Sequence, residues 1–437
     1  MHENPKVKVI YPVVRANRPV WPYINYDYQK KATEITELLR ANLPDIEFSQ
    51  SYSHLGEEAT EIVKGEYDGY LVYMIGQQWS EQWKAVIKKG FPTVLVDDLY
   101  AGTGDFLKTY SYAKRENLPV VGIASSNFSD VANAVSLFKV MKSMKEAKIL
   151  AVIDNEEEGL APLASRIKSI KDLFGTEVIR MSSDELNSYY NDTDENEAKK
   201  WADKWIDESL KVVEPSRDEI VKSAKMYLAL KKAMADKDVD AVTMDCLGLY
   251  YTGKLLAYPC LTFFQLNNEG STGVCEADLD STVTQLMMRY LTKRPGYVSD
   301  PVIDTASNQI IYAHCVATNR VYGADGLANP YIIRSHSEDN KGASIQSLMP
   351  LGKEITTVKV NVGEKALSIH QGKTVANVED DKGCRTKLAA EVDSEKILNN
   401  YHFERFSWHR VSVYGDWRRQ VINLGILLGL QVFEEDK

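Results

Sequence analysis

The chain has 437 residues, more than one hydrophobic core usually supports, so two or three domains are expected. Hydrophobic residues make up 44% of the sequence and charged residues 26%, which is ordinary for a globular protein. The formal net charge of -10 argues against a general nucleic-acid-binding protein, which needs a basic face, but it leaves room for a small anionic substrate.

The sequence contains no stretch of about 18 apolar residues, and its start lacks the apolar core of a secretion signal. The number of cysteines is odd, and no two of them form a CxxC pair, which favours free thiols in a reducing compartment. These cysteines are Cys246, Cys260, Cys275, Cys315 and Cys384. We therefore expect a cytoplasmic protein without nucleic-acid or membrane partners.

Short apolar runs alternate with helical periods in the first third of the chain. Strands are expected at Lys6–Val13, Ile46–Ser49, Gly69–Met74, Pro92–Val96 and Pro119–Ala124. Helices are expected at Asp27–Asn42, Gly56–Gly65, Trp79–Lys89 and Asp130–Met144. This alternation predicts a parallel sheet covered on both faces, a Rossmann-like domain over residues 1–145. The first strand is not followed by GxGxxG, so a dinucleotide is not expected.

A second α/β set predicts a central domain over residues 146–295. Its expected strands are Lys148–Asp154, Glu177–Met181, Val239–Met244 and Leu261–Leu266, and its expected helices include Leu163–Phe174 and Ala277–Leu291. The polar segment Asp194–Asp238 is interpreted as a solvated two-helix excursion. Polar residues such as Asn268 follow the last of these strands, where open α/β sheets bind ligands.

The pattern changes after about residue 296. Strands are expected at Ile303–Ala313, Thr356–Val362, Ala366–Ile369, Thr374–Val378 and Thr386–Val392, followed by a helix at Asp416–Leu428 and a strand at Leu430–Phe433. These runs predict a C-terminal β-rich, barrel-like domain over residues 296–437. The expected fold is thus two Rossmann-like α/β domains followed by this third domain.

Acidic residues and histidines gather in two stretches, Asn267–Cys315 and His402–Trp417. A hard divalent ion favours carboxylate oxygens and tolerates imidazole, so a metal site is one interpretation. The alternatives stay open at this stage. Asp278 and Asp280 suit the first turn of a helix, where acids stabilise the helix dipole. A lone histidine in a strand, such as His314, is more often a core residue than a ligand.

Three segments carry a resemblance to a known family. They are the run from Glu269 to Cys315, the stretch HQGKTVANVEDDKGCRTKLAAEV and the ending WHRVSVYGDW…LGILLGLQV. Together they resemble the L-fucose isomerase family, with L-arabinose isomerase more distant. The resemblance covers the last part of the central domain and the C-terminal domain. It implies an aldose–ketose isomerase that uses Mn²⁺ or another divalent cation such as Mg²⁺ or Co²⁺. It also implies a homo-oligomer, with a hexamer as one possibility.

The resemblance implies that Glu276 and Asp300 bind the metal and also move protons, with His409 as a further ligand. It places His314 in the site as a proton relay or second ligand. The metal would polarise the carbonyl of the opened sugar and stabilise a cis-enediolate while the carboxylates move protons. Trp408 and Tyr414 are candidate sugar-stacking residues, although core packing explains either one equally well.

The sequence does not name the sugar: a deoxy-sugar, a pentose or an anionic sugar, for example a sulfonated one, remain open. Arg405 stands where the resemblance predicts a neutral amide, and its guanidinium suits an anionic group. The alternative for Arg405 is a salt bridge with Glu404 or another acid. Two other functions stay open, a non-catalytic sugar-binding protein and a metal-dependent sugar epimerase or lyase.

Overall fold

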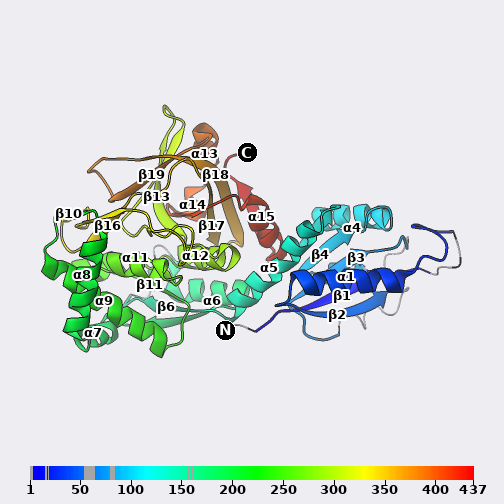
Figure 1. The fold of residues 1–437 in the computed structure, drawn as a ribbon, viewed down its shortest axis with the longest axis horizontal. Coiled ribbons are helices and arrows are strands. Elements are labelled where there is room, and N and C mark those ends of the chain that lie inside the picture. Colours follow the sequence, from blue (N-terminus) through cyan, green and yellow to red (C-terminus); the bar gives the residue numbers. More distant parts are fainter. Residues whose placement is uncertain are drawn as a thin grey trace. The chain divides into compact units, whose positions relative to one another are not determined.

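The computed structural model describes residues 3–14, 17, 19–53, 64–78, 84–155, 157–158 and 161–437 (Figure 1). Most of the expected helix Gly56–Gly65 and the first part of Trp79–Lys89 lie outside these residues. The chain forms two compact units, one of residues 1–145 with 419–432 and one of residues 146–418 with 433–437. The predicted division into three domains stays a prediction.

The first unit is built on a five-stranded parallel sheet in the order β2-β1-β3-β4-β5. The strands are β1 (Lys6–Pro12), β2 (Glu47–Ser53), β3 (Gly69–Met74), β4 (Thr93–Asp97) and β5 (Val120–Ala124). The helices are α1 (Tyr28–Asn42), α3 (Lys84–Lys88), α4 (Thr103–Arg115) and α5 (Phe128–Glu146). All five predicted strands form. Four of them are the continuous apolar runs that are typical of buried strands in a parallel sheet, whereas the edge strand β2 is polar and mostly exposed or half-buried.

A four-stranded parallel sheet, in the order β12-β11-β6-β9, lies in the second unit. Its strands are β6 (Lys148–Val152), β9 (Glu177–Met181), β11 (Ala241–Met244) and β12 (Thr272–Val274). A short hairpin of β7 (Glu157–Glu158) and β8 (Ala161–Pro162) follows β6. The helices of this part are α6 (Leu163–Phe174), α7 (Ser183–Asn191), α8 (Glu195–Glu208), α9 (Arg217–Asp236), α10 (Cys246–Tyr251), α11 (Cys260–Asn268) and α12 (Leu279–Thr292).

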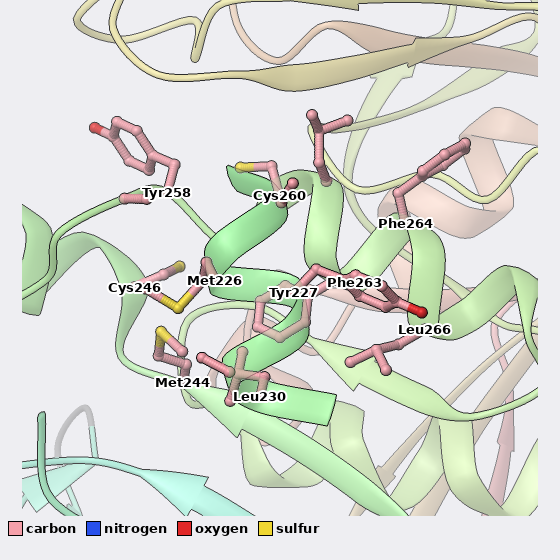
Figure 2. Close-up of a cluster of buried hydrophobic side chains, with 14 of the residues drawn as sticks. Met226, Tyr227, Leu230, Met244, Cys246, Tyr258, Cys260, Phe263, Phe264 and Leu266 are labelled. Carbon is pink, nitrogen blue, oxygen red and sulfur yellow. The ribbon is translucent and has the colours of Figure 1, made fainter. Parts of the chain in front are cut away.

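Two predictions for this part are wrong. The segment Leu261–Leu266 is helical, within α11, because a short apolar run buried on all sides lacks the periodicity that separates helix from strand. The segment Asp194–Asp238 forms the two predicted helices α8 and α9, but their inner faces belong to a large hydrophobic core. Figure 2 shows Tyr227 and Leu230 of this segment beside Phe263 of α11.

Six antiparallel strands close into a barrel in the order β17-β20-β13-β14-β19-β18, with β17 pairing again with β18, and β21 extends the sheet beside β18. These strands are β13 (Tyr297–Asp304), β14 (Gln309–His314), β17 (Glu354–Asn361), β18 (Ala366–Asn377), β19 (Thr386–Glu391), β20 (Arg410–Tyr414) and β21 (Gln431–Glu434). A separate sheet contains β10 (Lys211–Val212), β15 (Tyr331–Arg334) and β16 (Ser344–Ser347). The short helices α13 (Ser394–Asn400) and α14 (Phe403–Phe406) precede β20, and α15 (Arg418–Leu427) follows it.

The barrel confirms the mixed α/β fold with a closed β-rich part, while the number of Rossmann-like domains stays a prediction. Two details of the predicted strands are wrong. Ile303–Ala313 is not one strand, because Asp304 ends β13 and a turn leads into β14. Ala366–Ile369 and Thr374–Val378 belong largely to the single strand β18, whose register shifts between Thr374 and Ala376. In the described part of the chain, we find no helix with both the length and the apolarity needed to cross a membrane.

Candidate active site

Three neighbouring barrel strands bring predicted site residues from distant parts of the chain together. β13 contains Asp300, β14 ends at His314, and His409 directly precedes β20. β13 pairs with β14 on one side and with β20 on the other, with Asp300 opposite Ala313 and Ser299 opposite Arg410. The antiparallel register therefore brings the middle of β13 next to the last residue of β14 and the start of β20, so that Asp300, His314 and His409 are neighbours.

Glu276 reaches the same place from the loop between β12 and α12. Both Glu276 (φ 63°) and Ala277 (φ 53°) have left-handed backbone conformations, which are costly for residues other than glycine and concentrate at functional sites. The Oε2 atom of Glu276 lies 3.6 Å from Nε2 of His409, and Oδ1 of Asp300 lies 3.2 Å from the same nitrogen. The two carboxylates thus converge on one imidazole nitrogen.

The opposite edge of the His409 ring is fixed by Asp278. Nδ1 of His409 donates to Oδ2 of Asp278 at 2.9 Å, and the same carboxylate oxygen accepts from Nζ of Lys359 at 2.6 Å. Asp278 is also the N-cap of α12, accepting from the backbone N–H of Ser281 at 2.8 Å. Lys359 is buried on β17 and donates to Oγ of Ser281 as well. These bonds aim the second nitrogen, Nε2, at the two carboxylates.

The charges of the cluster shift its pKa values strongly. Burial by itself would raise the pKa of the Glu276 carboxyl, but His314 and His409 lower it to about 2. Burial by itself would lower the pKa of His409, but its bonds to Asp278 and Asp300 raise it to about 10. Lys359 and His409 outweigh burial at Asp278 and hold its pKa well below the usual range. These interactions therefore keep the Glu276 and Asp278 carboxyls charged and His409 protonated at neutral pH.

His314 is buried and faces Glu276, with 3.6 Å between its Nε2 and Oε1 of Glu276, which is too long for a hydrogen bond. Its Nδ1 accepts from the backbone N–H of Cys315 at 2.9 Å. Among the described residues, Nε2 of His314 has no hydrogen-bond partner. A buried polar atom without a partner is uncommon and indicates a place for an ion or a substrate atom.

The residues of this cluster fit a divalent cation. One potential ligand atom each from Glu276, His314 and His409 lies within 4.8 Å of the other two, and Asp300 adds a carboxylate oxygen beside His409. Carboxylate oxygens with an imidazole nitrogen suit Mn²⁺, Mg²⁺ or Co²⁺. The carboxylates of Glu276 and Asp300, which converge on Nε2 of His409, support the fit. Metal binding itself stays a prediction.

Trp408 and Arg405 lie on the segment that leads to His409. Trp408 is 50% exposed, and its indole N–H donates to the carbonyl oxygen of Pro301, the residue after Asp300. It therefore lies at the rim of the cluster with exposed ring surface. Arg405 donates from Nε to Oε2 of Glu364 at 2.7 Å and stacks on the ring of Phe433. The contacts of Arg405 thus include the salt bridge that the sequence offered as its alternative role.

Asn268 and Tyr414, two further predicted substrate-binding residues, do not contact the acidic cluster. Asn268 ends α11, and its Oδ1 accepts from the backbone N–H groups of Asn319 and Arg320, so it holds a loop. Tyr414 belongs to the barrel core, and its hydroxyl donates to the carbonyl oxygen of Pro350 at 2.9 Å. The structure does not bring either residue into contact with the acidic cluster, and their substrate-binding roles stay predictions.

Sequence reasoning missed Asp278 and Lys359 as part of the site. Asp278 does lie at the start of a helix, as expected, but its second oxygen holds His409. A signal for Lys359 was present, because it is a single lysine inside the β-branched run TTVKVNV of a buried strand. A lysine is rarely buried without an acidic partner, so this position predicts a nearby carboxylate.

Comparison with known proteins gives one kind of relative. The chain is similar to the sulfoquinovose isomerases of Priestia aryabhattai and Priestia megaterium, with 23% identity over 306 residues in each case. The similar segment covers 68% of this chain and 66% of each relative, just under two thirds of their length. The chain matches no family model.

Proposed function

We propose that this protein is a metal-dependent aldose–ketose isomerase that acts on a sulfonated sugar. The observation that carries the proposal is the convergence of Glu276 and Asp300 on Nε2 of His409. The similarity to two proteins named sulfoquinovose isomerase supports both the reaction type and the anionic substrate. Membership of the L-fucose isomerase family is part of the same proposal.

Glu276, Asp300 and His409 would hold the divalent ion, with Asp278 and Lys359 fixing the orientation of His409. When bound, such an ion supplies an electrophile that polarises the carbonyl of an opened sugar and stabilises negative charge on oxygen. Glu276 is suited to act as a base, because its low pKa keeps it charged at neutral pH. Its side chain is 35% exposed, which leaves it open to a substrate from solution.

The isomerisation is a balanced proton shift within the substrate. A carboxylate of the pair Glu276 and Asp300 takes the proton from C2 of the open-chain aldose, and the C2–H electrons form the C1=C2 double bond of an enediolate. A proton is then returned to C1, the proton on O2 is lost, and O1 ends protonated, so an aldehyde and an alcohol become an alcohol and a ketone. The reaction needs no external oxidant or reductant, and two positioned carboxylates suffice to move these protons.

A panel of aldoses tests the proposal. Purified protein is incubated with sulfoquinovose, glucose, L-fucose and D-arabinose, with and without added Mn²⁺, and each product is identified by ¹³C NMR. We expect ketose from sulfoquinovose, with Mn²⁺, at a rate well above that for glucose. An aldose inverted at C2 would indicate an epimerase, and binding of the sugar without any product would indicate a sugar-binding protein. Either result would contradict the proposed isomerase.

A further inference from the structure

The two histidines of the cluster differ in the hydrogen-bonding role of the nitrogen that faces it. At His314, Nδ1 lies 2.9 Å from the backbone nitrogen of Cys315, which can only donate, so Nδ1 holds a lone pair. A neutral imidazole has a single N–H, which must then be at Nε2. Protonating Nδ1 as well would set two N–H groups against each other. The edge of His314 that faces Glu276 is therefore a hydrogen-bond donor.

At His409 the arrangement is reversed. Its Nδ1 lies 2.9 Å from Oδ2 of Asp278, and that oxygen also accepts from Lys359, so the carboxylate is an acceptor and Nδ1 is the donor. When the His409 ring gives up one proton to bind a cation, that proton leaves Nε2, and the lone pair on Nε2 then points toward Glu276 and Asp300. An outer carboxylate that fixes the tautomer in this way is the usual support of a metal-binding histidine.

We infer that His409 is the one histidine that binds the ion and that His314 instead donates its Nε2–H to an oxygen of the sugar. The inference rests on the proposed metal-dependent function. Binding an ion through Nε2 of His314 would require either breaking the bond from Cys315 or removing the last proton from the ring, and both are costly in a buried site. Within the described residues, Nε2 of His314 meets no acceptor at hydrogen-bond distance, so the donor is free to meet a substrate oxygen.

A donor held at this position has a chemical use in the proposed reaction. Negative charge develops on the sugar oxygens as the enediolate forms, and a preorganised N–H stabilises that charge more than it stabilises the neutral substrate. The Nε2 of His314 is part of a buried side chain, so water competes little for it. His314 thereby becomes a catalytic residue that touches the substrate but not the ion.

Mn²⁺ binding to the whole protein tests this division without relying on turnover. Electron spin-echo spectroscopy of the Mn²⁺-loaded protein counts directly bound imidazole nitrogens, and we expect one. His314→Ala and His314→Gln should bind Mn²⁺ within about 2-fold of wild type, whereas His409→Gln should lose at least the roughly 10-fold seen when outer supports of a metal site are removed. His314→Ala should lose about 10²-fold in kcat, the usual cost of an oxyanion donor, and the amide N–H of His314→Gln should restore part of it.

Two bound imidazole nitrogens, or a loss of Mn²⁺ affinity in His314→Ala as large as that in His409→Gln, would overturn the inference. The nitrogen count needs only the wild type, so a poorly folding variant does not prevent the decision. If wild-type protein binds no Mn²⁺, the inference also falls. Conversion of the sugar under those conditions would keep the isomerase reaction but end its dependence on Mn²⁺, whereas no conversion would end both proposals.

Discussion

Two histidines of the barrel region, His409 and His370, each have an acidic and a basic side chain nearby. They differ in the surroundings of their second ring nitrogen. His370 is buried, with Nε2 at 2.7 Å from the Tyr312 hydroxyl and Nδ1 at 2.7 Å from Glu435, which also binds Arg410. Both of its nitrogens are occupied. His409 has Asp278 and Lys359 on one side, while its other nitrogen faces two carboxylates.

The two histidines thus differ in geometry: both nitrogens of His370 have partners in a closed network, whereas His409 belongs to the candidate site. The network around His370 closes on itself and fills the barrel with satisfied polar groups, which is what buried charge requires. The cluster around His409 directs the carboxylates of Glu276 and Asp300 and the Nε2 of His409 toward one point. Among the described residues, the nearby Nε2 of His314 has no hydrogen-bond partner.

The largest expected effect is on stability, at Glu435. The substitution Glu435→Gln leaves the buried Arg410 guanidinium without its charge partner. Breaking a buried ion pair lowers the free energy of unfolding by about 3–5 kcal/mol. Chemical unfolding followed by tryptophan fluorescence measures the loss. Glu434→Gln is the matched control, because its pair with Arg418 is partly exposed and should cost about 1 kcal/mol or less. Equal losses in the two variants would mean that the His370 network does not stabilise the barrel.

The second effect is on turnover, at Glu276. Glu276→Gln keeps the shape of the side chain but removes its charge, and we expect kcat to fall at least ~10²-fold, or about 2.7 kcal/mol in activation free energy. The fold should stay intact, and the loss of stability should be smaller than in Glu435→Gln, because the Glu276 side chain is 35% exposed and lies 3.6 Å from both histidines. Glu269→Gln is the control, because Glu269 contacts Tyr227 and Lys231 instead of the cluster. Near-normal turnover of Glu276→Gln would refute the assigned role.

The third effect is a pH dependence of stability. Burial would raise the pKa of Glu435, but Arg410 and His370 lower it to about 2, below the roughly 4.3 expected in the unfolded chain. The charged Glu435 therefore makes its full contribution to the free energy of unfolding above about pH 4.3. This contribution is lost as the pH falls toward 2, and roughly 2 kcal/mol of it is lost by pH 3. The unfolding free energies of wild type and Glu435→Gln should approach each other by that amount between pH 6 and pH 3. A gap that stays constant would contradict this shift.

The smallest effect concerns Arg405, which lies on the helix before His409 and packs on Phe433, close to the Glu435 network. If Arg405 binds the sulfonate, Arg405→Ala should lower the preference for sulfoquinovose over glucose about 10-fold, the worth of one charge-assisted hydrogen bond. Glu364→Gln, which frees Arg405 from its acid, should keep or raise that preference. An unchanged preference in Arg405→Ala would assign Arg405 to the salt bridge alone.

The sequence predicted most strands of the parallel sheets, because many of them are continuous apolar runs, as in Gly69–Met74. It did not predict the short strand β12. It failed at Leu261–Leu266, where a helix buried on all sides has no polar face to reveal its period. The barrel strand Arg410–Tyr414 was not predicted as a strand, although it lies at the centre of the site.

The residues of the candidate site were predicted only through the resemblance. Asp278 and Lys359, which hold His409 in place, were not predicted as part of the site. The approach of Asp300 to His409 depends on the pairing of β13 with β20, and such long-range register is not visible in local patterns. The bond between Asp278 and His409 joins residues 131 positions apart. Lys359, by contrast, could have been noticed, because a buried lysine calls for an acidic neighbour.

Sulfoquinovose conversion in D₂O by protein freed of metal with a chelator, before and after Mn²⁺ is restored, tests the central claim most directly. We predict no ketose from the chelated protein. After Mn²⁺ is added, and less so after Zn²⁺, we predict ketose that has taken up solvent deuterium at C1, because the proton passes through a carboxylate that exchanges with water. Full conversion after exhaustive chelation would contradict the metal-dependent isomerase that we propose.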